Sequence, residues 1–209
     1  MTESKQLGKW RGEFGDEYIK RNRADSTRVH SSTTMWQKIL HAANGDPPKS
    51  ILEVGSNIGA NLVALRDLTD AELWAVEPNA KAREELAKSN VLPKDHILDG
   101  VAQRIPLRDG AADLAFTSGV LIHIAPADLL TACREIHRCA RKYVACIEYF
   151  SDQPEEKRYR GQTELLFKRD FGAFWLDNFP DLVAVDYGFN WRPMTGLDNS
   201  TWWLFAKRS

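Results

Sequence analysis

The chain has 209 residues, enough for one substantial domain with a single core but short for two. Its 28 basic residues balance 29 acidic ones to a net charge of -1, so no overall field recruits nucleic acid or an anionic membrane. The first residues lack an apolar signal region, and no run reaches the roughly 18 apolar residues of a membrane span. We therefore expect a cytoplasmic monomer or homodimer that acts on a small molecule, with no nucleic acid or membrane as partner.

The predicted elements alternate in the order expected of an α/β domain over residues 1–209. Strands are predicted over 51–54, 72–77, 95–98, 112–117, 142–149, 182–188 and 201–207. Helices are predicted over 12–24, 32–43, 58–68, 79–89, 126–139 and 167–179. The first two helices form an N-terminal cap over 1–45, and residues 150–171 form an insertion that faces the substrate.

Seven strands interleaved with helices predict a doubly wound, mostly parallel, Rossmann-like sheet. No helical pattern separates the last two strands, so we expect them to form an antiparallel hairpin. The three cysteines, Cys133, Cys139 and Cys146, follow neither a C-x-x-C nor a zinc pattern. They are expected to be reduced and buried, and no metal site is predicted.

The stretch from Ser50 to Leu62 reads as a buried strand, a glycine turn and the start of a helix. Gly55 and Gly59 bracket the turn, which allows the backbone to approach a ligand. Glu53 ends the strand, where a carboxylate would repel a pyrophosphate but suits a cationic group. The turn therefore favours S-adenosyl-L-methionine, which carries an ammonium and a sulfonium.

A second acid, Glu77, ends the next strand about 20 residues after Gly55, a spacing suited to binding ribose hydroxyls. Together with Glu53, Gly55 and Gly59, it resembles the first two motifs of the class I methyltransferases. The resemblance implies that cofactor contacts extend to Ser56 and Asn57 in the turn and to Pro78 after Glu77. Asn57 replaces the middle glycine of many such enzymes, and asparagine tolerates a left-handed backbone well.

Further cofactor contacts are expected beyond the next two strands. Asp99, Gly100 and Val101 follow the third strand, where they would meet the adenine, with Asp99 accepting from its amino group. A plain surface turn is the alternative. Ser118 follows the fourth strand, where class I enzymes meet both cofactor and acceptor.

A narrower resemblance covers nearly the whole chain. Its segments are Trp10 to Asn22, Leu121 to Ile124, Tyr159 to Gly161, Leu166 to Phe171, and Asp198 with Thr201 and Trp202. They look like the bacterial methylases associated with pseudaminic acid biosynthesis, which implies a sugar-pathway or other small-metabolite acceptor. The family's usual Asn-Pro-x-Pro after the fifth strand is replaced here by residues 150–156, which leaves a different acceptor open.

Tyr18, Arg21 and Asn22 share one face of the first predicted helix. Because the resemblance includes them, they are expected to contact the cofactor, with Arg21 facing its methionine carboxylate. The alternative is that they only cap the domain. His123 is the first candidate for a general base, because imidazole titrates near neutral pH. Glu148 and Tyr149, at the end of the fifth strand, are rival catalytic candidates.

Tyr159, Arg160, Lys168 and Arg169 form a basic, aromatic group in and after the insertion. It is either a solvated charged face or a substrate-binding site for an anionic acceptor. We therefore expect methyl transfer to O or N of a small anionic metabolite, of a sugar, nonulosonic acid or other natural-product type. The alternative is a non-catalytic cofactor-binding or complex-forming protein with the same fold. An RNA substrate is disfavoured by the charge balance and by the lack of an Asn/Asp-Pro-Pro-Tyr run after the fourth strand.

Overall fold

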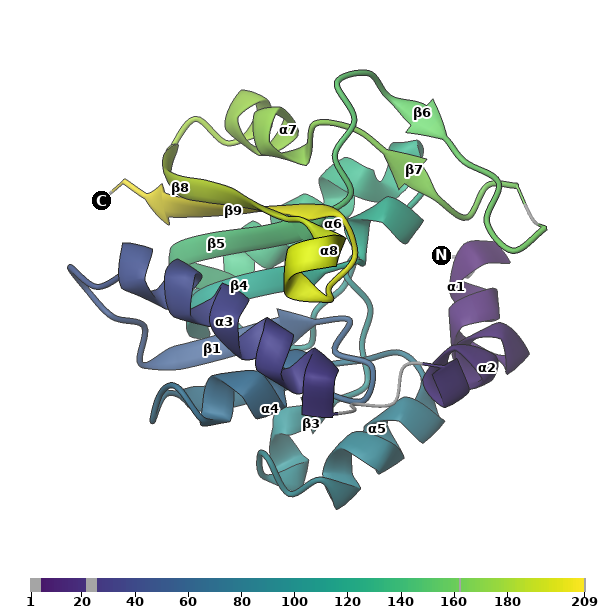
Figure 1. Ribbon diagram of the computed structural model, residues 1–209, viewed down its shortest axis with the longest axis horizontal. Helices are drawn as coiled ribbons and strands as arrows, with labels where there is room; N and C mark the ends of the chain where they lie inside the picture. The colour runs from purple at the N-terminus through teal and green to yellow at the C-terminus, as the bar shows by residue number, and fades with distance from the viewer. Residues whose placement is uncertain (1–4, 22–25, 162, 209) are drawn as a thin grey trace.

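The computed structural model describes residues 5–21, 26–161 and 163–208 (Figure 1). Its helices are α1 (Lys5–Arg11), α2 (Glu13–Arg21), α3 (Ser26–Ala42), α4 (Ala60–Arg66), α5 (Ala80–Lys88), α6 (Pro126–Cys139), α7 (Phe171–Asn178) and α8 (Arg192–Thr195), with 3₁₀ turns η1 (Lys94–His96) and η2 (Leu121–His123). Its strands are β1 (Ser50–Val54), β2 (Glu72–Val76), β3 (Ile97–Leu98), β4 (Ala112–Ser118), β5 (Ala140–Glu148), β6 (Glu155–Glu156), β7 (Phe167–Lys168), β8 (Leu182–Asn190) and β9 (Ser200–Lys207).

Seven strands form one sheet in the order β3-β2-β1-β4-β5-β9-β8. The five strands from β3 to β5 pair in parallel, whereas β9 runs antiparallel to both β5 and β8. This confirms the predicted doubly wound sheet and its C-terminal hairpin. Because the first five strands point the same way, their carboxyl ends meet at one edge, where a ligand site is expected.

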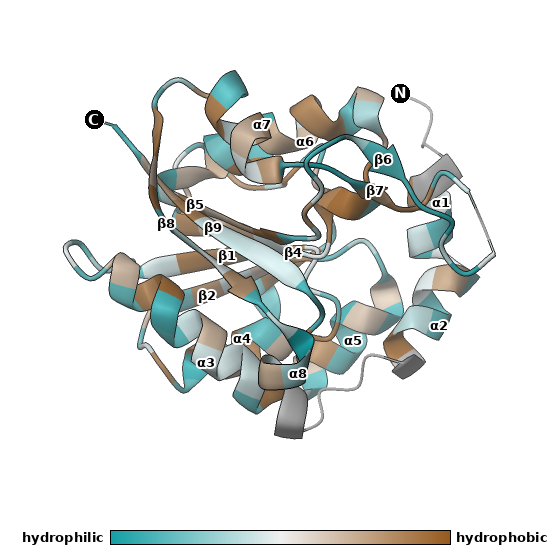
Figure 2. Cartoon of the chain, turned by 45° about the horizontal axis from the view of Figure 1, so that its top comes forward, coloured by the Kyte–Doolittle hydropathy of each residue, from teal (hydrophilic) through white to brown (hydrophobic). Residues whose placement is uncertain are grey.

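Each face of the sheet is covered by helices. Alternate strand residues point to opposite faces, so Ile51 packs with α3 and α4 while Leu52 packs with α6 and α7. The helices carry hydrophilic residues mainly on their outer sides (Figure 2). Cys133, Cys139 and Cys146 are buried and unpaired within the α6 side of the core, as predicted.

Several element boundaries differ from the predicted ones. The helix expected over 12–24 is α2, and a further short helix, α1, precedes it and was not predicted. α3 begins at Ser26 rather than at residue 32. The helix expected from 167 begins at Phe171, because Phe167 and Lys168 pair with β6 and Asp170 caps the helix by accepting from the Ala173 N–H. The predicted cap of α5 is confirmed, since the Asn79 side chain accepts from the Ala82 N–H at 3.0 Å.

Within the described part of the chain, no helix is long and apolar enough to cross a membrane. Nor do the described residues place three His, Cys, Asp or Glu side chains together as metal ligands.

Candidate active site

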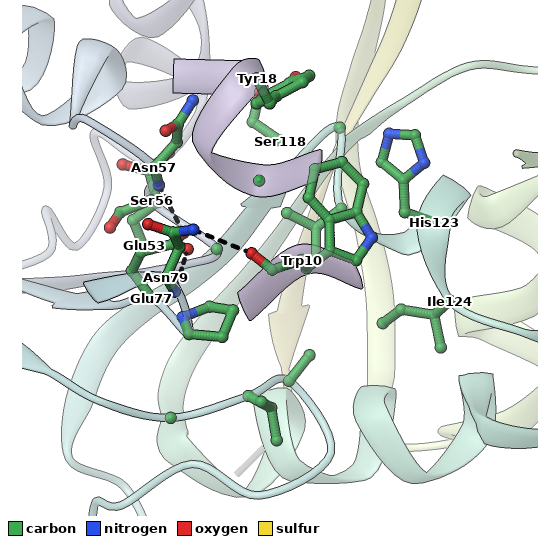
Figure 3. Close-up of a pocket in the computed structure, with 18 of the residues that line it drawn as sticks. Trp10, Tyr18, Glu53, Ser56, Asn57, Glu77, Asn79, Ser118, His123 and Ile124 are labelled. Carbon is green, nitrogen blue, oxygen red and sulfur yellow. Dashed lines mark hydrogen bonds between the residues drawn. The ribbon is translucent and has the colours of Figure 1, made fainter. Parts of the chain in front are cut away.

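A first cavity of about 160 Å³ lies at the carboxyl ends of β1, β2 and β4, beneath α1 and α2 (Figure 3). Ten of the predicted cofactor residues line it: Tyr18, Glu53, Gly55, Ser56, Asn57, Glu77, Pro78, Gly100, Val101 and Ser118. Residues from five segments of the chain therefore meet at the edge of the sheet where the sequence predicts a cofactor.

The turn after β1 has the left-handed backbone that its sequence predicts. The φ angles of Gly55, Asn57 and Gly59 are +78°, +49° and +81°. A Cβ on Gly55 would lie 2.5 Å from the Val120 side chain, and one on Gly59 would overlap Leu86. The two glycines are thus required by packing as well as by backbone angle. Gly59 is the N-cap of α4 and is not among the residues that line the cavity, so its role as a cofactor contact stays a prediction.

Glu77 links the two motifs of the site. Its Oε2 accepts from the Asn57 N–H and its Oε1 from the Asn79 N–H, both at 2.8 Å (Figure 3). Burial raises the pKa of this carboxyl, while the two backbone donors and the Arg83 guanidinium oppose the rise. Each oxygen keeps a lone pair for a further donor, such as a hydroxyl in the cavity.

Glu53 is buried beside the same cavity and is only partly satisfied. Its Oε1 accepts from the Asn61 side-chain amide at 2.7 Å, whereas Oε2 has no hydrogen-bond partner among the described residues. Burial raises the pKa of Glu53 to about 8, the Asn61 bond lowers it, and repulsion by Glu77 adds to the rise. A buried carboxylate oxygen without a donor is costly, so a cationic group would stabilise it.

The N-terminal helices close the first cavity from above. The Asn79 side chain donates to Trp10 O at 3.2 Å (Figure 3). It also donates to Asp16 Oδ1 at 3.0 Å, and the two bonds join α1 and α2 to the start of α5. Gly15 is buried at this junction, where any Cβ would collide with Trp10 O. Trp10 packs edge-on against Tyr18, with ring centroids 5.3 Å apart. Both aromatic side chains line the cavity.

The remaining predicted cofactor residues lie elsewhere. Asp99 is exposed and forms ion pairs with Arg11 at 3.1 Å and Arg83 at 3.3 Å, outside the cavity lining. Its expected bond to adenine stays a prediction, and opposite charges from α1 and α5 hold its carboxylate. Arg21 ends α2, but its side chain is not described, and Asn22 lies outside the described residues.

A second cavity of about 420 Å³ adjoins the first. The two cavities share Tyr18, Ala60, Asn61, Ser118, Gly119 and His123. The other polar side chains of the second cavity come from α3, the end of β5, the insertion and the β8–β9 connection: Ser32, Glu148, Tyr149, Tyr159, Arg160, Asn190, Asp198 and Ser200. A molecule here would touch the first cavity through the shared residues.

His123 lies at this junction, between the rings of Trp10 (4.8 Å) and Tyr159 (5.3 Å). Its Nδ1 is bonded to the Leu165 carbonyl, which can only accept, so Nδ1 carries the proton. Nε2 then holds the lone pair and has no partner among the described residues. Burial lowers the pKa of His123 to about 4, which the Leu165 bond partly offsets. The imidazole is therefore neutral at pH 7.

Glu148 is fully buried and accepts from the backbone N–H groups of Val120, Leu121 and Ile122 at 3.1, 3.0 and 3.4 Å. Burial raises its pKa to about 7, and the backbone donors oppose the rise. Three donors already occupy the carboxylate. Glu148 is therefore suited to fixing the position of η2, the turn that carries His123. It is less suited to exchanging a proton with a bound molecule.

Tyr149 donates its hydroxyl to Asp198 at 3.1 Å. Its pKa is raised well above the usual range, first by burial and then by the nearby Asp198 charge. The phenol is therefore protonated at neutral pH and can orient a ligand by hydrogen bonding, but it is a poor source of phenolate.

The four basic and aromatic residues of the predicted substrate site divide into two sets. Tyr159 and Arg160 line the second cavity, with the Arg160 guanidinium 5.5 Å from the Tyr159 ring centre. Lys168 lies over the Tyr149 ring and Arg169 over Phe174, and neither lines the cavity. None of the three cations forms an ion pair with a carboxylate within the described part of the chain. Arg160 is thus the cation best placed to meet an anionic ligand.

Sequence reasoning missed several lining residues, notably Trp10, Asn61, Asn79 and Gln103. Trp10 could have been found, because it shares a helical stripe with Phe14 and Tyr18 at spacings of four residues. Asn61 contributes to the site only because its amide reaches Glu53 across the turn, a contact that no sequence pattern indicates.

The sheet order, the antiparallel last strands and the carboxylates at the ends of β1 and β2 define the class I methyltransferase fold. Residues 52–147 match the family model described as a methyltransferase domain. The cofactor that this fold and domain indicate is S-adenosyl-L-methionine, as the sequence predicts.

Three solved structures illustrate the likeness. The 1,6-didemethyltoxoflavin-N1-methyltransferase of Burkholderia thailandensis is 19% identical, with 97% of this chain and 88% of that chain covered at a TM-score of 0.73. A magnesium protoporphyrin IX methyltransferase from Synechocystis PCC 6803 is 12% identical, with 97% and 98% covered at 0.70. A SAM dependent methyltransferase from Aquifex aeolicus is 16% identical, with 93% and 100% covered at 0.65. At such identities the likeness establishes the fold alone. No curated protein matches the sequence significantly.

Proposed function

We propose that this protein transfers a methyl group from S-adenosyl-L-methionine to an oxygen or nitrogen of a small anionic metabolite. The observation that carries the proposal is the pair of adjoining cavities, which share Ser118, Gly119 and His123. One has the acids and the glycine turn suited to the cofactor, and the other has room for an acceptor. Two solved structures of the same fold bear the names of small-molecule methyltransferases, which supports this choice.

The residues of the first cavity fit the cofactor. The unpartnered Oε2 of Glu53 would hold a positive group, and Glu77 would accept from ribose hydroxyls. When bound, S-adenosylmethionine supplies an electrophilic methyl group, which the acceptor takes by in-line displacement. The protein's main task is then to align the acceptor and to take its proton, if it has one. The neutral His123, with its lone pair on Nε2 at the junction, is suited to that second role.

The walls of the second cavity suit a polar acceptor with an anionic group. Hydroxyl and amide side chains, including Ser32, Asn190 and Ser200, could bind hydroxyl groups, and Arg160 could bind a carboxylate or phosphate. A sugar acid or a related natural-product intermediate has both features. The narrower likeness to methylases associated with pseudaminic acid biosynthesis agrees with such an acceptor and remains part of the proposal.

The test is incubation of the purified protein with S-adenosylmethionine carrying a labelled methyl group and with fractions of a metabolite extract. Label should move to a small molecule, and S-adenosylhomocysteine should form in equal amount. If calorimetry detects cofactor binding but no fraction is methylated, the non-catalytic alternative is favoured. Absence of any cofactor binding would contradict the proposal at its first step.

We expect the affinity for S-adenosylmethionine to rise with pH towards about 8, because Glu53 must ionise to hold a cation. Below that pKa the free carboxyl is mostly protonated, so each unit of falling pH costs up to about 1.4 kcal/mol of binding free energy. Calorimetry at about pH 6.5, in two buffers of different ionisation enthalpy, should detect a proton released on binding. Glu53→Gln should bind without that release. Equal release from both proteins would assign the proton to another group.

Arg160→Ala should raise the KM of an anionic acceptor by about 10- to 100-fold, because a charge-assisted hydrogen bond is lost. Affinity for S-adenosylhomocysteine should stay normal, since Arg160 does not line the first cavity. Arg158→Ala is the matched control, because that guanidinium donates to Gly161 O and faces neither cavity. An unchanged KM in Arg160→Ala would favour a solvated role for this side chain.

A further inference from the structure

The two edges of the seven-stranded sheet differ greatly in length. β3 has two residues, whereas β8 has nine and pairs only with β9 among the described residues (Figure 1). A long edge strand presents a row of unpaired N–H and C=O groups, and native proteins usually protect it with lysine, proline or a cover. β8 contains neither lysine nor proline, and Asp186 is its one charged residue. A β-bulge between Ala184 and Asp186 interrupts β8, so the part of this edge that lacks protection is the regular run after it, from Asp186 to Asn190.

The side chains on this edge are unusually apolar for an exposed strand. Tyr187 is 73% exposed and Phe189 57% exposed, and their alternate spacing places both on one face of the strand. Directly after β8, Trp191 is 57% exposed and Met194 on α8 is 82% exposed. Such large side chains rarely gather on the free surface of a monomer and mark an interaction site when they do. We call this surface the β8–α8 edge.

We propose that the β8–α8 edge is the interface of a homodimer, in which β8 pairs antiparallel with β8 of a second copy. Antiparallel pairing of a strand with its own copy is two-fold symmetric. The β8 strand of each copy therefore hydrogen-bonds to the open edge of the other. A two-fold axis that passes through Gly188 places Tyr187 of each copy opposite Phe189 of the other copy. Such aromatic pairs stabilise antiparallel strands, and the same register keeps the two Asp186 carboxylates apart.

The amount of apolar surface agrees with this partner. The three aromatic side chains, each more than half exposed, offer roughly 300–400 Å² per copy. Met194, Val185 and the strand backbone add further exposed area to these three side chains. For comparison, a standard protein–protein interface buries about 800 Å² on each partner. The edge also borders the second cavity, since Asn190 and Ser200 line it. A second copy would thus sit beside the wall of the proposed acceptor site.

Sedimentation velocity on the full chain, from low to high micromolar concentration, tests the proposal directly. The wild type should have about twice the 23.7 kDa mass of one chain. The double variant Tyr187→Lys, Phe189→Lys should have the mass of a single chain, because four lysines would meet at the axis. Leu176→Lys on α7, also at an exposed apolar residue, is the matched control and should remain dimeric. Circular dichroism checks that each variant is folded.

A monomeric wild type across the whole range would overturn the proposal, as would a double variant that stays dimeric. Hydrogen exchange gives an independent measurement that needs no variant. The outward amides of β8 should exchange more slowly as protein concentration rises, while those of α4 should not change. A dimer whose β8 amides exchange at the same rate at all concentrations would assign the interface to another surface.

Discussion

Replacing His123 by alanine should lower the rate of methyl transfer to a protonated acceptor about 10²- to 10⁴-fold, the usual contribution of a general base. His123 lines both cavities, and Leu165 O fixes the proton on Nδ1, which leaves the lone pair on Nε2. Turnover at saturating cofactor and acceptor, followed through S-adenosylhomocysteine formation, measures the effect. Affinity for S-adenosylhomocysteine should change much less, because Glu53 and Glu77 are intact.

The pH dependence separates this role from a merely structural one. Burial lowers the pKa of His123 to about 4, so the base form is complete above that value and is lost only as pH falls through it. Turnover should therefore lose the contribution of His123 only at a pH far below the ordinary pKa of imidazole. His96→Ala is the matched control, since His96 Nδ1 also bonds a backbone carbonyl, Leu73 O, but its ring stacks on Trp74 away from both cavities. A near-normal rate in His123→Ala would remove it as the base.

Glu77→Ala should weaken the binding of S-adenosylmethionine by about 1–3 kcal/mol, the cost of losing charge-assisted hydrogen bonds. The same change removes the acceptor of the Asn57 and Asn79 N–H groups, so the glycine turn and the start of α5 also lose a shared support. Calorimetry with S-adenosylmethionine and with S-adenosylhomocysteine measures the loss. Both ligands should be affected alike, because both carry the ribose.

Glu72→Ala is the control for this change, since Glu72 begins the same strand but is exposed at its other end. Its affinity for the cofactor should equal that of the wild type. If Glu77→Ala binds as tightly as Glu72→Ala and is equally stable to heat, Glu77 does not contact the cofactor.

The sequence predicted the sheet well because its strands are buried on both faces and read as short apolar runs between turns. β1 and β4 are almost wholly buried, which explains why Ile51 to Val54 and the stretch from Ala112 were recognisable. The hairpin of β8 and β9 was predictable for a different reason, since the connection lacks a pattern long enough for a covering helix. α8, which was not predicted, has only four residues. Residues 150–170 resisted prediction because β6 and β7 are only two residues each and depend on tertiary contacts.

The candidate site was predicted unevenly for a related reason. Gly55 and Asn57 belong to the turn after β1, and Glu77 ends β2, the next strand along the chain. The parallel pairing of β1 with β2 brings them together, and the short strand–helix–strand spacing makes that pairing predictable. The ion pairs of Asp99 with Arg11 and Arg83 were not predictable, because these two arginines come from helices distant in the sequence. Lys168 lies over the ring of Tyr149, which the sequence does not bring near it, whereas Arg169 lies over the ring of the nearby Phe174.

By itself, then, the sequence determined the fold class and the site for the cofactor, because both depend on hydrophobic periodicity and on short-range backbone geometry. Only the tertiary structure decided the second cavity, whose walls come from α2, α3, β5, the insertion and the β8–β9 connection. It also decided the protonation of Glu53 and His123, since burial sets their pKa values and burial is a property of the whole packed chain. The turn after β1 and the acid after β2 are thus readable from the sequence, whereas the walls of the second cavity come together only when the chain has folded.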